Sequence, residues 1–272
     1  MVKAVVDTDS FALLTVARLE WVKFESGSLR SVAEEFVRLR NPDHVRLHLD
    51  HVPVVEEDGL QVDYMPVFQE ALCLDYESVM IDGSRLSLDE NIRATRRVVD
   101  LAAASRVPVE AELGAVLGHA AGPLPPYEEL FASGKGFTDV SEAGQFVQAT
   151  RCDWLSEAVG NIHGAIEVRQ KDRKKVEARL DLERLERLKQ AAGIPLVLHG
   201  GSGIGQQNVR LAMQHGISKI NVATEIRQVY EAALREAKGA PLAQQAVYAR
   251  TRWVLEEWLG LAGNQDELLE KN

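Results

Sequence analysis

The chain has 272 residues, of which 46% are hydrophobic and 26% are charged, a composition typical of a globular protein. Its 31 basic and 41 acidic residues give a formal net charge of −10, so we do not expect a nucleic-acid-binding protein, which needs a basic surface. Two cysteines are too few for a disulfide framework, and the amino terminus lacks the apolar core of a signal peptide. No apolar run is long enough to span a membrane, so we predict a cytoplasmic protein without a membrane partner.

Short apolar runs alternate with helix-like segments along the chain. The predicted strands, in chain order, are Ala12–Val16, Val45–Leu49, Ser78–Ile81, Val107–Glu112, Trp154–Val159, Ile194–Leu198 and Ser218–Val222. This alternation indicates parallel strands joined by crossover helices. Seven strands in an α/β chain of 272 residues favour a TIM (β/α)8-type barrel over an open, doubly wound sheet.

Two of the predicted helices have clear end signals. Ser87, followed three residues later by Glu90, is a capping box that opens a helix over Ser87–Ala104. In Leu180–Ala192, leucines at three-residue spacing form an apolar stripe, and Gly193 is a natural stop.

The carboxyl-terminal part of the chain ends in a further predicted helix, Pro241–Leu261. The polar segment after it, residues 264–272, is predicted to be a loose tail. Because no linker or low-complexity tract divides the chain, we expect residues 1–272 to form one domain.

Histidines follow three of the predicted strands: His51, His163 and His199. A barrel carries its chemistry at the carboxyl ends of its strands, and these ends ring one face, so the three imidazoles can converge. Three neutral imidazoles with one open position make a catalytic zinc site. Any one of these histidines alone is more simply a core or loop residue, but the three together predict Zn²⁺.

Three acids lie at the same strand ends. Asp50 directly precedes His51, so its carboxylate can reach a substrate beside the metal and relay a proton. Asp82 and Glu112 can hold a second divalent or a monovalent cation, or orient the imidazoles. A helix cap or a salt-bridge partner is the plainer explanation for each of these two.

Two loops suit a phosphate group. The glycine-rich segment from His199 to Gly203 leads into a helix near Gln206, and Asn221–Thr224 begins the next helix in the same manner. Glycines let backbone amides approach an anion, and the amino terminus of a helix favours negative charge. Barrels commonly bind phosphate at the loops after strands seven and eight, although a simple turn can use the same residues.

Six segments, in this order, resemble the consecutive signature blocks of class II fructose- and tagatose-bisphosphate aldolases, over about Val45 to Tyr230. They are LHLDH (Leu47–His51), SVMIDGS (Ser78–Ser84), EAELG (Glu110–Gly114), GNIHG (Gly160–Gly164), LVLHGGSG (Leu196–Gly203) and KINVATE (Lys219–Glu225). Six blocks in order are far more specific than any one of them.

The resemblance implies a zinc-dependent lyase of carbohydrate metabolism and glycolysis that cleaves a ketose bisphosphate or joins its halves. It implies zinc on His51, His163 and His199, with Asp50 moving the proton at the hydroxyl where the carbon–carbon bond breaks. Asp82 and Glu112 match acids that hold a second metal in some members, and homodimers or homotetramers are usual. The half that becomes dihydroxyacetone phosphate would bind to Gly164, Gly200, Gly201, Ser202, Asn221, Val222, Ala223 and Thr224.

The chain departs from the family pattern near its amino terminus. Met1–Thr8 looks like the tail of the first helix and Ala12–Val16 like the second strand, so we expect a barrel that lacks its first strand. Either the sequence is truncated or another chain covers the seam. The loop after Glu112 lacks the acid that moves the carbon-bound proton in the family, and Glu128 or Glu129 is the candidate substitute.

Several functions stay open at this point. The sequence does not name the ketose, and fructose bisphosphate, tagatose bisphosphate and deoxy sugar acid phosphates all remain candidates. A catalytically silent zinc- and sugar-phosphate-binding relative is the alternative outside enzymes. A zinc hydrolase is disfavoured because it has no general need for a paired phosphate cradle. We see no buried lysine at a strand end that suits a Schiff base, which argues against a covalent aldolase mechanism.

Overall fold

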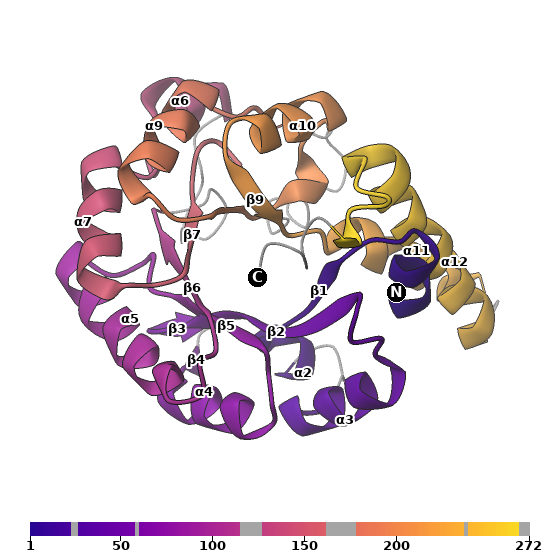
Figure 1. Cartoon of the computed structure of the whole chain (residues 1–272). Helices are drawn as coiled ribbons and strands as arrows, with labels where there is room; N and C mark the ends of the chain where they lie inside the picture. Colours follow the sequence, from indigo (N-terminus) through magenta and orange to yellow (C-terminus); the bar gives the residue numbers. More distant parts are fainter. Residues whose placement is uncertain (23–26, 58–59, 115–126, 162–177, 237–238, 267–272) are drawn as a thin grey trace.

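A computed structural model describes residues 1–22, 27–57, 60–114, 127–161, 178–236 and 239–266. In these parts of the chain, parallel strands form one curled, seven-stranded sheet in the order β1-β2-β5-β6-β7-β8-β9 (Figure 1). Their bounds are β1 Ala12–Ala17, β2 Val45–Pro53, β5 Ser78–Asp82, β6 Val109–Leu113, β7 Trp154–Glu157, β8 Leu196–Leu198 and β9 Ile217–Ile220. A small antiparallel ladder, β3 (Glu56–Glu57) with β4 (Leu60–Gln61), follows β2.

Helices surround the outer side of the sheet, as Figure 1 shows. They are α1 Val2–Asp7, α2 Arg18–Val22, α3 Leu29–Leu39, α4 Tyr64–Cys73, α5 Leu88–Ala103, α6 Tyr127–Ser133, α7 Val140–Thr150, α9 Leu182–Ala192, α10 Gln206–Gln214, α11 Thr224–Arg235 and α12 Gly239–Trp253, with the 3₁₀ turn η1 Gly201–Gly203 and the π-helical η2 Val254–Leu259. Among the residues described, none of the helices combines the length and the apolar character that a bilayer crossing needs.

The parallel sheet and its strand order confirm the predicted α/β barrel-type fold. Each predicted strand overlaps a strand of the structure. Strands β6 and β8 begin two residues later than predicted, because Pro108 and Pro195 have no N–H to donate to a ladder. In the described residues β1 and β9 are the edges of the sheet and do not pair with each other. Helices α11 and α12 lie beside this seam, and α12 packs against α11 and α1 (Figure 1).

The apolar core lies between the sheet and the helices. Leu185 and Leu188 of α9, the predicted stripe, are fully buried, and the helix ends at Gly193 with the left-handed φ of 66° that glycine tolerates. The α5 capping box is also present: the Ser87 amide donates to the Glu90 carboxylate at 3.2 Å. Burial of this apolar surface is the main driving force that holds the helices on the sheet.

The first residues of the predicted loose tail make specific contacts. The side-chain oxygen of Asn264 accepts a hydrogen bond from the Phe11 amide at 3.0 Å, and the Gln265 amide donates to the Asp9 carbonyl at 3.3 Å. Gln265 also reaches the Asp43 carbonyl at 3.1 Å. Residues 264 and 265 are thus tied to the turn before β1, while residues 267–272 lie outside the described part of the chain.

Candidate active site

Strand β2 supplies three polar side chains to the inner side of the curled sheet because its register slips once. His48 and Asp50 are two residues apart and therefore face the same side. His51 would face the other side, but the pairing of β2 with β5 shifts around it and its φ is 41°, in the left-handed region. A bulge re-aims a side chain in this way, and it brings the His51 ring into edge contact with the His199 ring.

Two predicted metal ligands, His51 and His199, lie directly against each other. His199 follows β8, and its Nδ1 is 2.8 Å from His51 Nε2, while its Nε2 is 2.8 Å from a carboxylate oxygen of Glu110. Because a carboxylate accepts, Nε2 is the donor nitrogen of His199, and the lone pair of Nδ1 faces His51. Burial, together with the charge of His51, lowers the pKa of His199, which keeps this ring neutral.

The predicted acids Asp82 and Glu112 flank the far side of the His51 ring. His51 Nδ1 lies 3.6 Å from Asp82 Oδ2 and 3.8 Å from Glu112 Oε2. Burial alone would lower the pKa of His51, but the hydrogen bond with Asp82 and the charges of Asp50 and Glu112 raise it to about 10. Burial and the charge of Asp82 raise the pKa of Glu112 well above its ordinary value. His51, Asp82 and Glu112 thus form one cluster of titratable side chains.

Asp50 is held in place by Asn221. The Asn221 Nδ2 atom, just after β9, lies 3.1 Å from each carboxylate oxygen of Asp50. Burial would raise the pKa of Asp50, but the hydrogen bond with His48 and the charge of His51 hold it well below its usual range. The carboxylate is thus ionised, which is the state that a proton acceptor must start from.

The two loops of the predicted phosphate site, His199–Gly203 and Asn221–Thr224, lie side by side. The Gly201 amide donates to the Asn221 carbonyl at 3.1 Å, and the Glu225 amide lies 3.4 Å from Ser202 Oγ. A Cβ on Gly201 would come within 2.8 Å of Ile220 Cγ2, so the close approach of the loops requires glycine there. This arrangement places Gly200, Gly201 and Ser202 next to Asn221, Val222, Ala223 and Thr224, the last being the first residue of α11.

The remaining predicted residues are either outside the described part of the chain or on the surface of α6. His163 and Gly164 lie outside the described residues, so their expected places as ligand and substrate contact are not seen. Glu128 lies on α6, where it forms an ion pair with Arg179 and its side chain is exposed. Glu129 is also exposed on α6. A surface ion pair of this kind contributes little to the stability of the fold. In this structure the Glu128 carboxylate pairs with Arg179.

Sequence reasoning missed three residues that the structure places beside the predicted ones: His48, Glu110 and Lys219. Glu110 Oε2 is 2.6 Å from Lys219 Nζ and 3.7 Å from His48 Nε2. The alternation of strands gave a usable signal, because residue 48 shares a face with Asp50 and residue 110 shares a face with Glu112. Lys219 is a lysine of β9 that the structure places at the site, with 15% of its side chain exposed. Its amine is paired with Glu110, which does not suit the free amine of a Schiff base.

A fourth residue that the sequence did not single out is Glu20 on α2. This short helix follows β1, whose last residue, Ala17, pairs in register with Asp50. Burial, with the charge of Asp50, raises the pKa of Glu20 to about 7. The carboxyl ends of β1 and β2 thus carry two interacting acids: the pKa of Glu20 is raised and the pKa of Asp50 is lowered.

The donor atoms present suit a divalent cation. One ligand atom from each of Asp50, His51 and His199 lies within 4.8 Å of the others, and the same holds for His51, Asp82 and Glu112. Both carboxylate oxygens of Glu112 are buried without a hydrogen-bond partner among the described residues. Imidazole nitrogens with carboxylates are the ligand set of zinc and related metals, and a cation would satisfy the buried oxygens.

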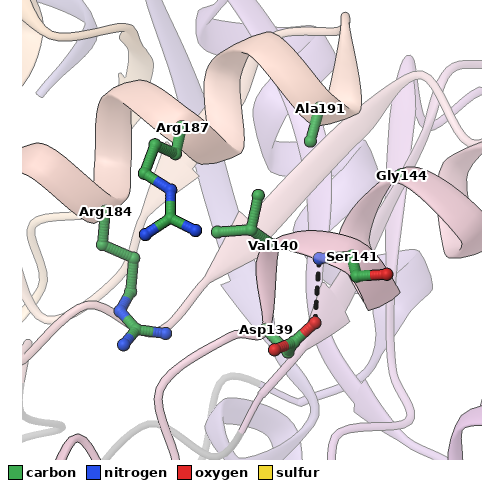
Figure 2. A pocket seen from close by; sticks show the side chains of 7 residues that line it. All are labelled: Asp139, Val140, Ser141, Gly144, Arg184, Arg187 and Ala191. Carbon is green, nitrogen blue, oxygen red and sulfur yellow. Dashed lines mark hydrogen bonds between the residues drawn. The ribbon is translucent and has the colours of Figure 1, made fainter.

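A separate hollow of about 490 Å³ lies on the outer side, between α7 and α9 (Figure 2). Its lining residues are Asp139, Val140, Ser141, Gly144, Arg184, Arg187 and Ala191. The Asp139 carboxylate accepts from the Ser141 amide at 2.8 Å and so caps α7, and Arg184 donates to the Thr138 carbonyl. These contacts are structural, and none of the site residues lines this hollow.

Comparison with known proteins assigns the chain to one family. Residues 1–265 match the family described as Fructose-bisphosphate aldolase class-II. The fructose-bisphosphate aldolase of Geobacillus stearothermophilus is 35% identical over 192 residues, 71% of this chain and 58% of that protein. The 6-phospho-5-dehydro-2-deoxy-D-gluconate aldolase of Halalkalibacterium halodurans is 35% identical over 191 residues, 70% of this chain and 57% of that protein.

A third relative is similar in both sequence and structure. The YdjI protein of Escherichia coli is 38% identical over 177 residues, 65% of this chain and 59% of its own. The crystal structure of the YdjI aldolase superposes with a TM-score of 0.73 and 25% sequence identity, covering 97% of this chain and 87% of that chain. In the sequence comparisons, the chain spans less than two thirds of the length of these three relatives.

Proposed function

The chain belongs to the class II fructose-bisphosphate aldolase family, and from this premise we propose that it catalyses the metal-dependent aldol cleavage or formation of a phosphorylated ketose. One observation carries the proposal: the facing nitrogens of His51 and His199, 2.8 Å apart, lie beside an ionised Asp50 that Asn221 holds in place. In the proposal, this combination supplies two metal ligands next to a proton acceptor, which is what aldol cleavage needs.

In the proposal Zn²⁺ is held by His51 and His199, with His163 as the predicted third ligand. When bound, the cation acts as a Lewis acid that stabilises the negative charge of an enediolate. Asp82 and Glu112 are the candidates for a second cation, which the buried, unpaired oxygens of Glu112 support.

Asp50 takes the hydroxyl proton in the proposed cleavage. As the proton leaves, the electron pair of that O–H bond forms the carbonyl of the aldehyde product, and the pair of the breaking carbon–carbon bond passes to the ketone half. That half becomes the enediolate, which gains a proton at carbon to give dihydroxyacetone phosphate. The two contacts from Asn221 orient the Asp50 carboxylate, and orientation of a reacting group is itself a large part of catalysis.

The phosphate of the ketone half is proposed to bind where the loops His199–Gly203 and Asn221–Thr224 meet. The contact between Gly201 and Asn221, with the amino terminus of α11 beside them, supports this placement. Gly164 and Ser202 are further proposed contacts. Because the curated relatives include aldolases for fructose bisphosphate and for a deoxygluconate phosphate, we keep both substrate types, with tagatose bisphosphate as a third. A homodimer or homotetramer in the cytoplasm, acting in glycolysis, remains the expectation from the family.

The proposal is tested by incubating the protein with fructose-1,6-bisphosphate, tagatose-1,6-bisphosphate or 6-phospho-5-dehydro-2-deoxygluconate and measuring product release. We expect cleavage of one of them, loss of turnover with EDTA, and recovery with Zn²⁺. Asp50→Asn should lower kcat by about 10²- to 10⁴-fold, the usual contribution of general acid–base catalysis, while keeping the metal.

A matched control for the Asp50 variant is Asp100→Asn on α5, whose exposed carboxylate pairs with Arg96; this variant should leave turnover unchanged. Turnover that survives both EDTA and Asp50→Asn would contradict the proposal. Stoichiometric metal binding without turnover on any of the three substrates would instead favour a silent sugar-phosphate-binding relative.

A further inference from the structure

A chain of charged contacts crosses the inner side of the sheet beneath the two histidines. Lys219 projects from β9, and its Nζ lies 2.6 Å from Glu110 Oε2 and 3.3 Å from His48 Nε2. Glu110, on β6, is completely buried and uses its other oxygen to contact His199 Nε2 at 2.8 Å. The contacts thus link β9, β6 and β2 with the residue that follows β8.

The orientation of the His199 ring depends on this carboxylate. A histidine that binds a metal through one nitrogen must carry its proton on the other, and the partner of that other nitrogen decides which tautomer forms. Here Glu110 takes Nε2–H, so the Nδ1 lone pair faces His51. The carboxylate must therefore stay fixed with one oxygen toward His199.

Lys219 is the group that fixes the direction of the Glu110 carboxylate. A buried carboxylate that loses its counter-ion is strongly destabilised, and it turns toward any other donor within reach. The Lys219 ammonium occupies the second oxygen and leaves only the first for His199, so the direction of the carboxylate is set. His48, the second partner of Lys219, is itself anchored at 2.7 Å to Ser78 Oγ, which gives the lysine a defined place.

From this geometry we propose that Lys219 is a positioning residue that, through Glu110, holds the His199 ring and its tautomer ready for metal binding. The inference rests on the metal site of the proposed function. It assigns the lysine no contact with substrate and no covalent role. Its effect is on the affinity for metal and on the ring of His199, both of which can be measured without turnover.

The test compares Lys219→Met, which keeps most of the length of the side chain but removes its charge, with Glu110→Gln and with the double variant. Zn²⁺ affinity is measured by competition with a chromophoric chelator. We expect Lys219→Met to weaken binding by about 10- to 100-fold, the range seen when outer partners of metal ligands are lost. Lys219→Met should add little in the Glu110→Gln background, because the lysine acts through Glu110.

A second readout is the ¹⁵N NMR spectrum of the His199 ring in the metal-free protein. The wild type should show the Nε2–H tautomer, and Lys219→Met should show a mixture of tautomers. A lysine with a merely structural role would change the melting temperature but not this signal. Lys219→Gln, which keeps a donor without the charge, covers the case in which the Met variant does not fold; we expect a loss of about tenfold.

The control is Lys135→Met, at an exposed turn residue after α6, which should change neither readout. Wild-type Zn²⁺ affinity with an unchanged His199 tautomer in a folded Lys219 variant would overturn the inference while leaving the proposed function intact. If the wild-type protein bound no metal, the proposed function would fail, and the tautomer measurement would still decide the role of Lys219.

Discussion

Glu157 at the end of β7 provides a stability prediction that does not depend on the metal site. Its neighbours in register are Leu113 on β6 and Leu198 on β8, so its side chain shares their face of the sheet. The carboxyl group is completely buried, and neither oxygen has a hydrogen-bond partner among the described residues. Burial raises the pKa of Glu157 from 4.5 to about 8.

The sign of the effect follows from proton binding. Between pH 4.5 and 8 the folded protein holds a proton on Glu157 that the unfolded chain has released, so the free energy of unfolding falls as pH rises. The slope is at most about 1.4 kcal/mol per pH unit, which gives a loss of about 3 to 5 kcal/mol across the window. The full stabilising contribution of the neutral acid is present only below about pH 4.5.

Glu157→Gln keeps the shape of the side chain but does not titrate. We would measure urea unfolding of both proteins at several pH values from 5 to 8.5, with EDTA present, and plot the difference in unfolding free energy. Groups common to both proteins cancel in that difference, so the variant should gain on the wild type by about 3 to 5 kcal/mol as pH rises.

A matched control for this series is Glu34→Gln, at an exposed position of α3. Its difference in unfolding free energy from the wild type should not change with pH. The reasoning would be refuted if the Glu157→Gln difference were also flat, within about 0.5 kcal/mol, since an ionised Glu157 would then already be tolerated in the fold.

Three further outcomes are expected at the site. Gly201→Ala places a Cβ 2.8 Å from Ile220 Cγ2, so it should destabilise the fold by about 1 to 3 kcal/mol in thermal unfolding and raise the KM for the phosphorylated substrate; an unchanged KM would argue against the phosphate cradle. Asn221→Ala removes both contacts to Asp50, so kcat should fall by about tenfold or more with Zn²⁺ content retained; loss of the metal instead would assign Asn221 to the metal site. His163→Ala should weaken Zn²⁺ binding as strongly as His199→Ala, and an affinity equal to wild type would remove His163 from the ligand set.

Much of the fold could be predicted because apolar runs mark buried parallel strands. The position of each strand followed from such runs, and their ends identified Asp50, His51 and His199 as neighbours. What could not be predicted is the bulge in β2. It depends on the pairing of β2 with β5, and without it a strict alternation would point His51 away from His199.

The buried charged residues could not be predicted from the sequence for a different reason. Glu110 and Lys219 lie within strands, where a charged residue usually indicates a side chain facing water. Only the curl of the sheet brings the two together across its inner side, at 2.6 Å. The surroundings of the candidate loop acid Glu128, exposed and paired with Arg179, are likewise visible only in the tertiary structure.

The most direct test of the central claim follows the ketone half alone, so that the identity of the aldehyde does not matter. Dihydroxyacetone phosphate is incubated with the protein in D₂O, and loss of its hydroxymethyl proton signal is followed by NMR. Metal-dependent proton removal predicts exchange of one proton with the Zn²⁺-loaded protein, and no exchange with EDTA or with His199→Ala. Exchange that continues at the same rate after metal removal, or no exchange in a folded protein with bound Zn²⁺, would contradict the account.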